Sequence, residues 1–176
     1  MERIEEEVYS YEYRRYQHFI TNSKWDHLGV IRDVQTQASV ILVAQKEING
    51  LPLGLFIDES STTKKGNESI RVSRQYAGSV GKVENCQVCV YGALCNDTST
   101  TLFHEKLFLP ESWTGDAKKC ECAGILEEHR KFKTKPQLAL EIIDECVEKG
   151  VLFDWIVLYG HGGALTNELD ESFFSC

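Results

Sequence analysis

The order of the apolar segments constrains the fold of this chain more than any other feature of its sequence. Short apolar runs bounded by polar or turn residues occur at residues 51–60, 86–94 and 101–110, and such runs predict β-strands. A helical pattern follows at residues 136–150, and the run FDWIVLYG at residues 153–160 predicts a fourth strand. The glycines and the segment ALTNELD behind that strand predict a turn and the start of another helix.

The helical pattern between the third and fourth strands has clear signals at both ends. Pro136 suits the first turn of a helix, and Gly150 suits its C-terminal cap. One apolar stripe lies between them and consists of Ala139, Ile142, Ile143, Cys146 and Val147. A crossover helix here returns the fourth strand parallel to the first, while the first three strands form an antiparallel meander. This mixed α/β sheet has the order of a ribonuclease H-like core.

The N-terminal part has a different, helical character. Ser23 followed by Asp26 resembles a capping box. Apolar residues then recur at helical spacing, at Trp25, Leu28, Ile31 and Val34. Asn49-Gly50 breaks the chain. We therefore expect a helical N-terminal segment over residues 1–50 and a sheet domain over residues 51–176.

Length and composition set the class of protein. A chain of 176 residues with 42% hydrophobic residues can form one globular domain with a core. The sequence has no apolar stretch of about 18 residues, and its opening is too charged and aromatic for a signal peptide. We expect a cytoplasmic protein without membrane contact. The seven cysteines are then expected to be reduced thiols, most of them core fillers.

The charge is acidic overall but locally basic. A net charge of -8 argues against nucleic-acid binding through overall charge. Two runs are nevertheless basic, residues 129–135 and residues 64–82. The second run contains Lys64, Lys65, Arg71, Arg74 and Lys82, with Glu68 as its single acid. Each run is either a solvated loop or a set of phosphate contacts.

Asp58 stands at the end of the apolar run LGLFID, where a buried strand would deliver a carboxylate to the edge of a sheet. Such an acid either caps a turn or binds a metal ion. Glu59 points the other way on an extended chain and is the weaker candidate ligand.

Other motifs give weaker signals. Cys86-x-x-Cys89 suggests zinc, but on a strand residues three apart face opposite sides, so buried thiols are the preferred interpretation. The glycines after His161 resemble an oxyanion loop, and Ala77 to Gly81 loosely resembles a nucleophile elbow, but their order is the reverse of that in α/β hydrolases. A phosphate cradle would need a lysine after the glycines, which this sequence does not have.

Several stretches taken together resemble a known family. The segment FIDESSTTKKGNESIRVSRQYAGSVGKVENCQVCVYGAL at residues 56–94 is similar to the opening of the catalytic domain of bacterial insertion-sequence DDE transposases, the DDE superfamily endonucleases. LFLPESW, FKTKPQLALEII and the helical lead-in QHFITNSKWD also resemble family segments. The resemblance runs from about residue 16 to residue 163.

The resemblance implies metal-dependent DNA cleavage and strand transfer by a ribonuclease H-like domain, in which three acids hold two Mg²⁺ ions. Asp58 matches the first acid. The family pattern of the fourth strand, placed on Trp155 and Ile156, puts the second acid at Tyr159, and the third acid would lie beyond Cys176. A phenol is a poor Mg²⁺ ligand, so we expect a truncated transposase fragment, incomplete at the C-terminus, that has lost strand-transfer activity.

The resemblance also implies partners. These are the DNA of transposon ends, contacted through Lys64, Lys65, Arg71, Arg74 and Lys82, and either a second copy of the chain or a full-length transposase. The alternative function is that of a non-catalytic protein that binds DNA or regulates a transposase.

Overall fold

The structure is a computed structural model that describes residues 13–24, 26–66, 69–97, 99–160 and 163–168. The chain forms two compact units, residues 1–32 and residues 33–176. Within the described residues, no helix is both long enough and apolar enough to cross a membrane.

The chain begins with helices, as the sequence predicts. Helix α2 spans Tyr13–Asn22 and helix α3 spans His27–Asn49. Asp26 caps α3, because its Oδ1 accepts a hydrogen bond of 2.9 Å from the backbone N–H of Gly29. Further along α3, the side chains of Gln35, Ala38 and Leu42 are the buried ones, whereas Val34 of the expected apolar stripe is 39% exposed.

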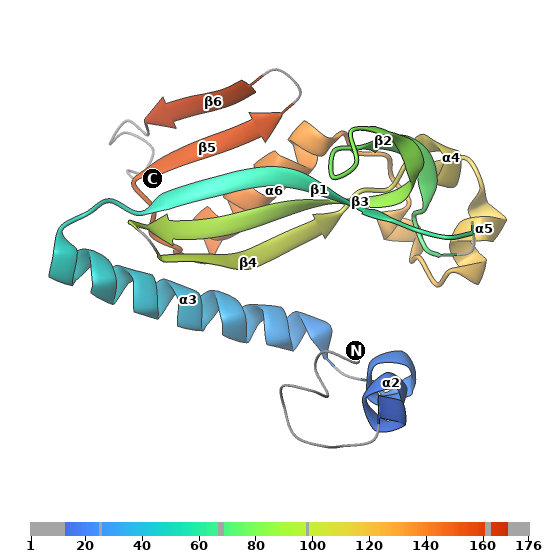
Figure 1. The fold of residues 1–176 in the computed structure, drawn as a ribbon, viewed down its shortest axis with the longest axis horizontal. Coiled ribbons are helices and arrows are strands. Elements are labelled where there is room, and N and C mark those ends of the chain that lie inside the picture. Colours follow the sequence, from blue (N-terminus) through green and yellow to red (C-terminus); the bar gives the residue numbers. More distant parts are fainter. Residues whose placement is uncertain (1–12, 25, 67–68, 98, 161–162, 169–176) are drawn as a thin grey trace. The chain divides into compact units, whose positions relative to one another are not determined.

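The rest of the chain is built on one six-stranded sheet (Figure 1). Its strands are β1 (Gly54–Thr63), β2 (Ser73–Ala77), β3 (Lys82–Asn96), β4 (Ser99–Leu107), β5 (Trp155–Gly160) and β6 (Gly163–Glu168). Their order across the sheet is β2-β3-β1-β5-β6, and β4 also pairs with β3. β1 and β4 are both antiparallel to β3, and β5 is parallel to β1. The predicted meander, parallel return and mixed α/β sheet are therefore confirmed.

Two elements differ from the prediction. β2 is an additional short strand that pairs antiparallel with the start of β3. The segment expected to begin a helix after the fourth strand is instead β6, which pairs antiparallel with β5 from Trp155↔Glu168 to Gly160↔Gly163. The prediction of a helix there was wrong. Thr166 and Asn167 have low intrinsic helix propensity, and the free edge of β5 offers a full set of backbone partners.

The crossover helix α6 spans Lys135–Glu148 and confirms the predicted helix. Thr134 and Gln137 form a capping box at its start, and Gly150 follows its end with φ of 68°. Its buried residues are Leu138, Ala139, Ile142 and Cys146. Between β4 and α6 lie the short helices α4 (Glu111–Thr114) and α5 (Ala117–Cys122) and the 3-10 turn η1 (Glu127–His129).

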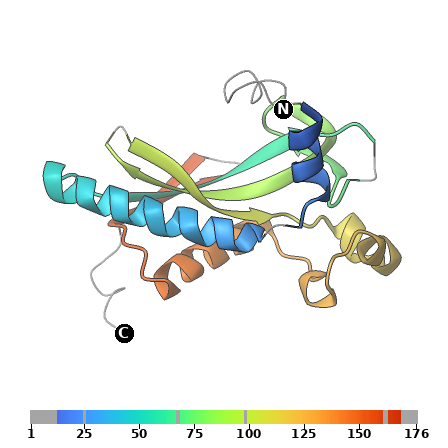
Figure 2. The same ribbon diagram turned by 90° about the horizontal axis from the view of Figure 1, so that it is seen from below.

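The two faces of the sheet differ. Leu55 and Ile57 of β1 share one core cluster with α3 and α6, the two long helices along the sheet (Figure 2). Side chains alternate along a strand, so Phe56 and Asp58 project from the opposite face. On that face Phe56 meets Trp155 edge to face, with ring centroids 4.9 Å apart. The fold thus places Asp58 on the face that α3 and α6 leave uncovered.

Candidate functional site

Asp58 and Tyr159 are neighbours on two parallel strands, with Asp58 in the middle of β1, which continues to Thr63, and Tyr159 near the carboxyl end of β5. The register of β1 and β5 runs from Gly54↔Trp155 to Ile57↔Leu158, so Asp58 and Tyr159 are the next residues along each strand. Both project from the face that carries Phe56 and Trp155, because they are separated from those residues by an even number of positions. The Tyr159 side chain is 51% exposed.

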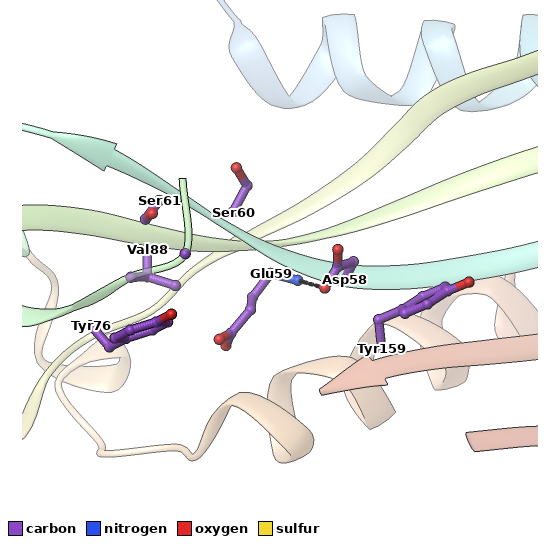
Figure 3. Close-up of a pocket in the computed structure, with 8 residues that line it drawn as sticks. Asp58, Glu59, Ser60, Ser61, Tyr76, Val88 and Tyr159 are labelled. Carbon is purple, nitrogen blue, oxygen red and sulfur yellow. Dashed lines mark hydrogen bonds between the residues drawn. The ribbon is translucent and has the colours of Figure 1, made fainter. Parts of the chain in front are cut away.

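These two residues line one pocket of about 240 Å³. Figure 3 shows its residues, which come from β1, the β2–β3 hairpin and β5. The complete lining is Asp58, Glu59, Ser60, Ser61, Tyr76, Gly78, Val88 and Tyr159. On one side the hairpin is held against β1 by Ser79, whose hydroxyl donates to the Ser61 carbonyl at 3.1 Å. Ser79, in the loose nucleophile-elbow pattern, thus serves as a structural contact here.

The two acids of this pocket have different surroundings. Asp58 Oδ1 accepts a hydrogen bond of 2.7 Å from the backbone N–H of Glu59. Glu59 leaves β1 in the opposite direction (Figure 3), and its Oε2 lies 2.7 Å from Lys135 Nζ. The side chains of this ion pair are only 23% and 27% exposed. Glu59 is therefore paired with Lys135 at the start of α6, whereas Asp58 projects from the opposite face of β1.

Strand pairing adds two residues that the sequence did not indicate. Tyr91 of β3 is opposite Asp58, and Glu105 of β4 is opposite Tyr91. The uncovered face therefore carries a row of Tyr159, Asp58, Tyr91 and Glu105 across four strands. These positions could be identified only from the register between strands, and no motif in the sequence marks that register.

Tyr91 of this row and the neighbouring Cys89 are uncharged at pH 7. Burial raises the pKa of Tyr91, and burial raises the pKa of the neighbouring Cys89 to about 12, so both are neutral at pH 7. Cys89 Sγ lies 3.8 Å from a carboxylate oxygen of Glu105. A neutral phenol, that of Tyr91, thus lies between the two acids of the row.

The donors of this face do not fit a pair of Mg²⁺ ions. Such ions need several carboxylate oxygens within one small site. Asp58 supplies one carboxylate, Tyr159 supplies a phenol, and Glu105 lies two strand spacings away, roughly 10 Å. In the part of the chain that the structure describes, no three His, Cys, Asp or Glu side chains gather closely enough to hold a metal ion.

The predicted DNA-contact residues lie around the ends of β1, β2 and β3. Lys64 and Arg74 lie on either side of Asn85 of β3, because Arg74 of β2 is paired with Asn85 and the Lys64 N–H, after β1, donates to the Asn85 carbonyl at 2.8 Å. Lys65 is exposed beside Lys64. Lys82 is exposed at the start of β3, where its ammonium lies 2.8 Å from Glu84.

Arg71 has different surroundings from the other four. Its backbone is left-handed, with φ of 60°, and its guanidinium donates to the Leu107 carbonyl. Burial lowers the pKa of this guanidinium below its ordinary value. Arg71 therefore braces β4 against the loop before β2, and of the five residues it is the least available to a phosphate.

The cysteine and glycine motifs add no second site among the residues described. Cys86, Cys89, Cys120 and Cys146 are buried free thiols, whereas Cys122 is exposed. The expectation of core-filling thiols is thus confirmed for those four. His161 and Gly162 of the possible anion loop lie outside the described residues.

Comparison with known proteins identifies the class. Residues 1–172 match the family model of the DDE superfamily endonucleases, and the chain belongs to this family. It is similar to the probable transposase for insertion sequence element IS701 from Microchaete diplosiphon, with 31% identity over 160 residues. The match covers 88% of this chain and 37% of that relative, so the chain spans little more than a third of the relative's length. No solved structure matches the chain significantly.

Proposed function

We propose that the sheet is a ribonuclease H-like core and that this chain is part of a DDE-type transposase, with Asp58 as the first metal-binding acid. The antiparallel β1, β3 and β4, the crossover α6 and the parallel β5 support this assignment. In a complete enzyme of this type Asp58 and two further acids would hold Mg²⁺, which would supply Lewis-acid activation of the DNA phosphodiester. Residues 1–50 would be a helical segment before the catalytic domain, which begins at residue 51, and the protein would act on DNA in the cytoplasm.

Tyr159 is proposed to occupy the position of the second acid, so that DNA cleavage and strand transfer are lost. One observation carries this proposal: Tyr159 directly follows the last β1–β5 pair and lines the same pocket as Asp58. A carboxylate there would face Asp58 across neighbouring strands, where side chains lie about 5 Å apart. A phenol offers Mg²⁺ one neutral oxygen in place of that charge.

Replacing the phenol tests the proposal. Tyr159→Asp is expected to gain binding of Mn²⁺, a spectroscopic substitute for Mg²⁺, at about millimolar or lower concentration, because two carboxylates then converge. The loss of the free-Mn²⁺ electron paramagnetic resonance signal measures this binding. Adding Asp58→Asn to the variant should abolish the gain. The matched control is Tyr76→Asp, which changes another half-exposed tyrosine of the pocket, 43% exposed, on a different strand.

Two results would contradict the proposal. Equal Mn²⁺ binding by Tyr159→Asp and Tyr76→Asp would mean that position 159 has no special relation to Asp58. Mn²⁺-dependent nicking of plasmid DNA by the unmodified chain, if lost in Asp58→Ala, would show that the site is active with Tyr159 in place.

The second candidate function is a non-catalytic protein that binds transposon-end DNA or regulates a transposase, by pairing with a second copy or with the full-length enzyme. The position of Lys64, Lys65 and Arg74 on either side of Asn85 in β3 favours it. Such contacts would release counterions, so affinity for DNA should fall steeply as salt rises.

The salt dependence of DNA binding tests this function. Changing both Lys64 and Lys65 to Gln is expected to weaken binding to every DNA sequence and to reduce the slope of log K against log salt by about 1 to 2. Fluorescence anisotropy with labelled duplexes measures both effects. Lys118→Gln, at an exposed lysine of α5, is the control. An unchanged slope in the double variant would exclude these two lysines as phosphate contacts.

A further inference from the structure

Helix α3 presents a second apolar stripe that faces away from the core. Val34, Ile41 and Ile48 are 39%, 63% and 87% exposed, and Gln37 and Ala44 between them are also exposed. The side of α3 that packs into the protein is different, since Ala38 and Leu42 belong to the core cluster. These five exposed residues, called the α3 seam below, belong to none of the core clusters of the described residues.

The spacing of the α3 seam is that of a coiled coil. Its residues are separated alternately by three and four positions, so Val34, Ile41 and Ile48 take the a positions of a heptad, and Gln37 and Ala44 take the d positions. In a coiled coil, side chains at a and d positions insert between residues of the facing helix. The stripe therefore matches another helix better than it matches the flat face of a sheet.

The polar residue of the seam indicates what that helix is. Gln37 would be buried at the centre of a helix pair, where an amide without a partner is costly. In a parallel pair of identical helices in register, Gln37 meets Gln37 of the other copy, and each amide can donate to the other. An unrelated apolar helix would leave the Gln37 amide unsatisfied.

The charges beside the seam select the same arrangement. Asp33 and Glu47 flank it on one side, at the g positions. In an antiparallel pair, g positions face g positions, which would bring Asp33 near Glu47 of the other copy and cause like-charge repulsion. In a parallel pair, the residue that faces Asp33 is at the e position, Ala38, so this repulsion is absent.

We propose that the α3 seam is a self-association surface through which two copies of this chain pair in parallel and in register. This inference deepens the self-association named as one option in the proposed function and requires neither metal nor DNA. A seam of about two heptads is short, and a small interface corresponds to a weak complex, with a dissociation constant of micromolar order.

Sedimentation velocity over a concentration series, without metal or DNA, tests the proposal. The unmodified chain should change from monomer to dimer over the micromolar range. Ile41→Lys is expected to raise the dissociation constant at least about tenfold, because it places a charge in the central layer. Leu140→Lys, at an exposed leucine of α6 that is 55% exposed, is the matched control and should dimerise normally.

A second variant distinguishes loss of the interface from misfolding of Ile41→Lys, because it is expected to change the dissociation constant in the opposite direction. Gln37→Leu replaces the amide in the seam by an apolar side chain and is expected to lower the dissociation constant of the dimer.

Single cysteines test the orientation of the two helices, in a chain that also carries Cys122→Ser and Cys176→Ser. Val34→Cys and Ile48→Cys should each form disulfide-linked dimers on their own.

The contrary outcomes are distinct from failure of the metal-binding proposal. A chain that stays monomeric at all concentrations, or that dimerises equally well as Ile41→Lys, would overturn the assignment of a second copy to the α3 seam. Cross-links that form only between Val34→Cys and Ile48→Cys chains would overturn the parallel arrangement.

Discussion

Asp154 joins three elements through one carboxylate. Its two oxygens lie 2.5 and 2.7 Å from Lys46 Nζ near the end of α3, and Oδ2 also accepts the backbone N–H of Leu53 before β1 at 2.7 Å. The Asp154 N–H in turn donates to the Leu53 carbonyl at 2.8 Å. Asp154, at the start of the β5 segment, thus sets the register in which β5 meets β1, and with it the position of Tyr159 beside Asp58.

Removing this carboxylate should destabilise the fold. Asp154→Ala leaves the Leu53 N–H and the Lys46 ammonium without their partner, which is expected to cost about 1–3 kcal/mol, because the site is only part-buried. The free energy of unfolding in urea measures this cost. Asp144→Ala, at an exposed acid of α6, is the control and should change stability by less than about 0.5 kcal/mol. Equal free energies of unfolding for the two variants would mean that the contacts of Asp154 with Lys46 and Leu53 do not stabilise the fold.

At the scale of elements, α6 is held on β4 by a charged cluster as well as by apolar packing. Glu145 accepts hydrogen bonds from His104 at 2.8 Å and from Lys106 at 2.5 Å, and Lys106 also lies 3.4 Å from Glu141. His104 is buried, with 8% of its surface exposed. Burial raises the pKa of Glu145, but the hydrogen bonds from Lys106 and His104 outweigh burial and bring the pKa down to about 2.

This cluster predicts an acid-dependent part of the stability. The folded-state pKa of Glu145 is about 2, against an ordinary value of 4.5. The ionised Glu145 therefore stabilises the folded state fully above pH 4.5, and this stabilisation is lost as the pH falls towards 2. Glu145→Gln should therefore be less stable than the unmodified chain near neutral pH, and the difference should shrink in that acid range. Urea midpoints at several pH values measure it. Glu148→Gln, at an exposed residue of α6, is the control, and a difference independent of pH would contradict the expectation.

For the whole molecule, the catalytic proposal and the self-association proposal concern different surfaces. Asp58 and Tyr159 lie on the face of the sheet that α3 and α6 leave uncovered, whereas the α3 seam faces away from the core cluster. Variants such as Tyr159→Asp and Ile41→Lys are therefore expected to act independently, because they share no partner. An active or an inactive metal site would be compatible with either oligomeric state.

Much of the architecture was predictable because it depends on local patterns. The apolar runs, Pro136 and Gly150 predicted three strands, a helix and a strand, and the break at Asn49-Gly50 matches the end of α3. Predictions failed where local signals were weak. β2 is short and half polar, and β6 is a strand because an adjacent edge was free to pair with it, which no local pattern encodes.

The sequence by itself determined that an acid, Asp58, ends one apolar run and that a phenol, Tyr159, ends another, because apolar patterns and family resemblance depend on consecutive residues. Only the tertiary structure decided that the two lie side by side, with Tyr91 and Glu105 continuing the row and Glu59 turned towards Lys135. The physical reason is register: a slip of one residue between β1 and β5 would have sent one of the two side chains to the opposite face.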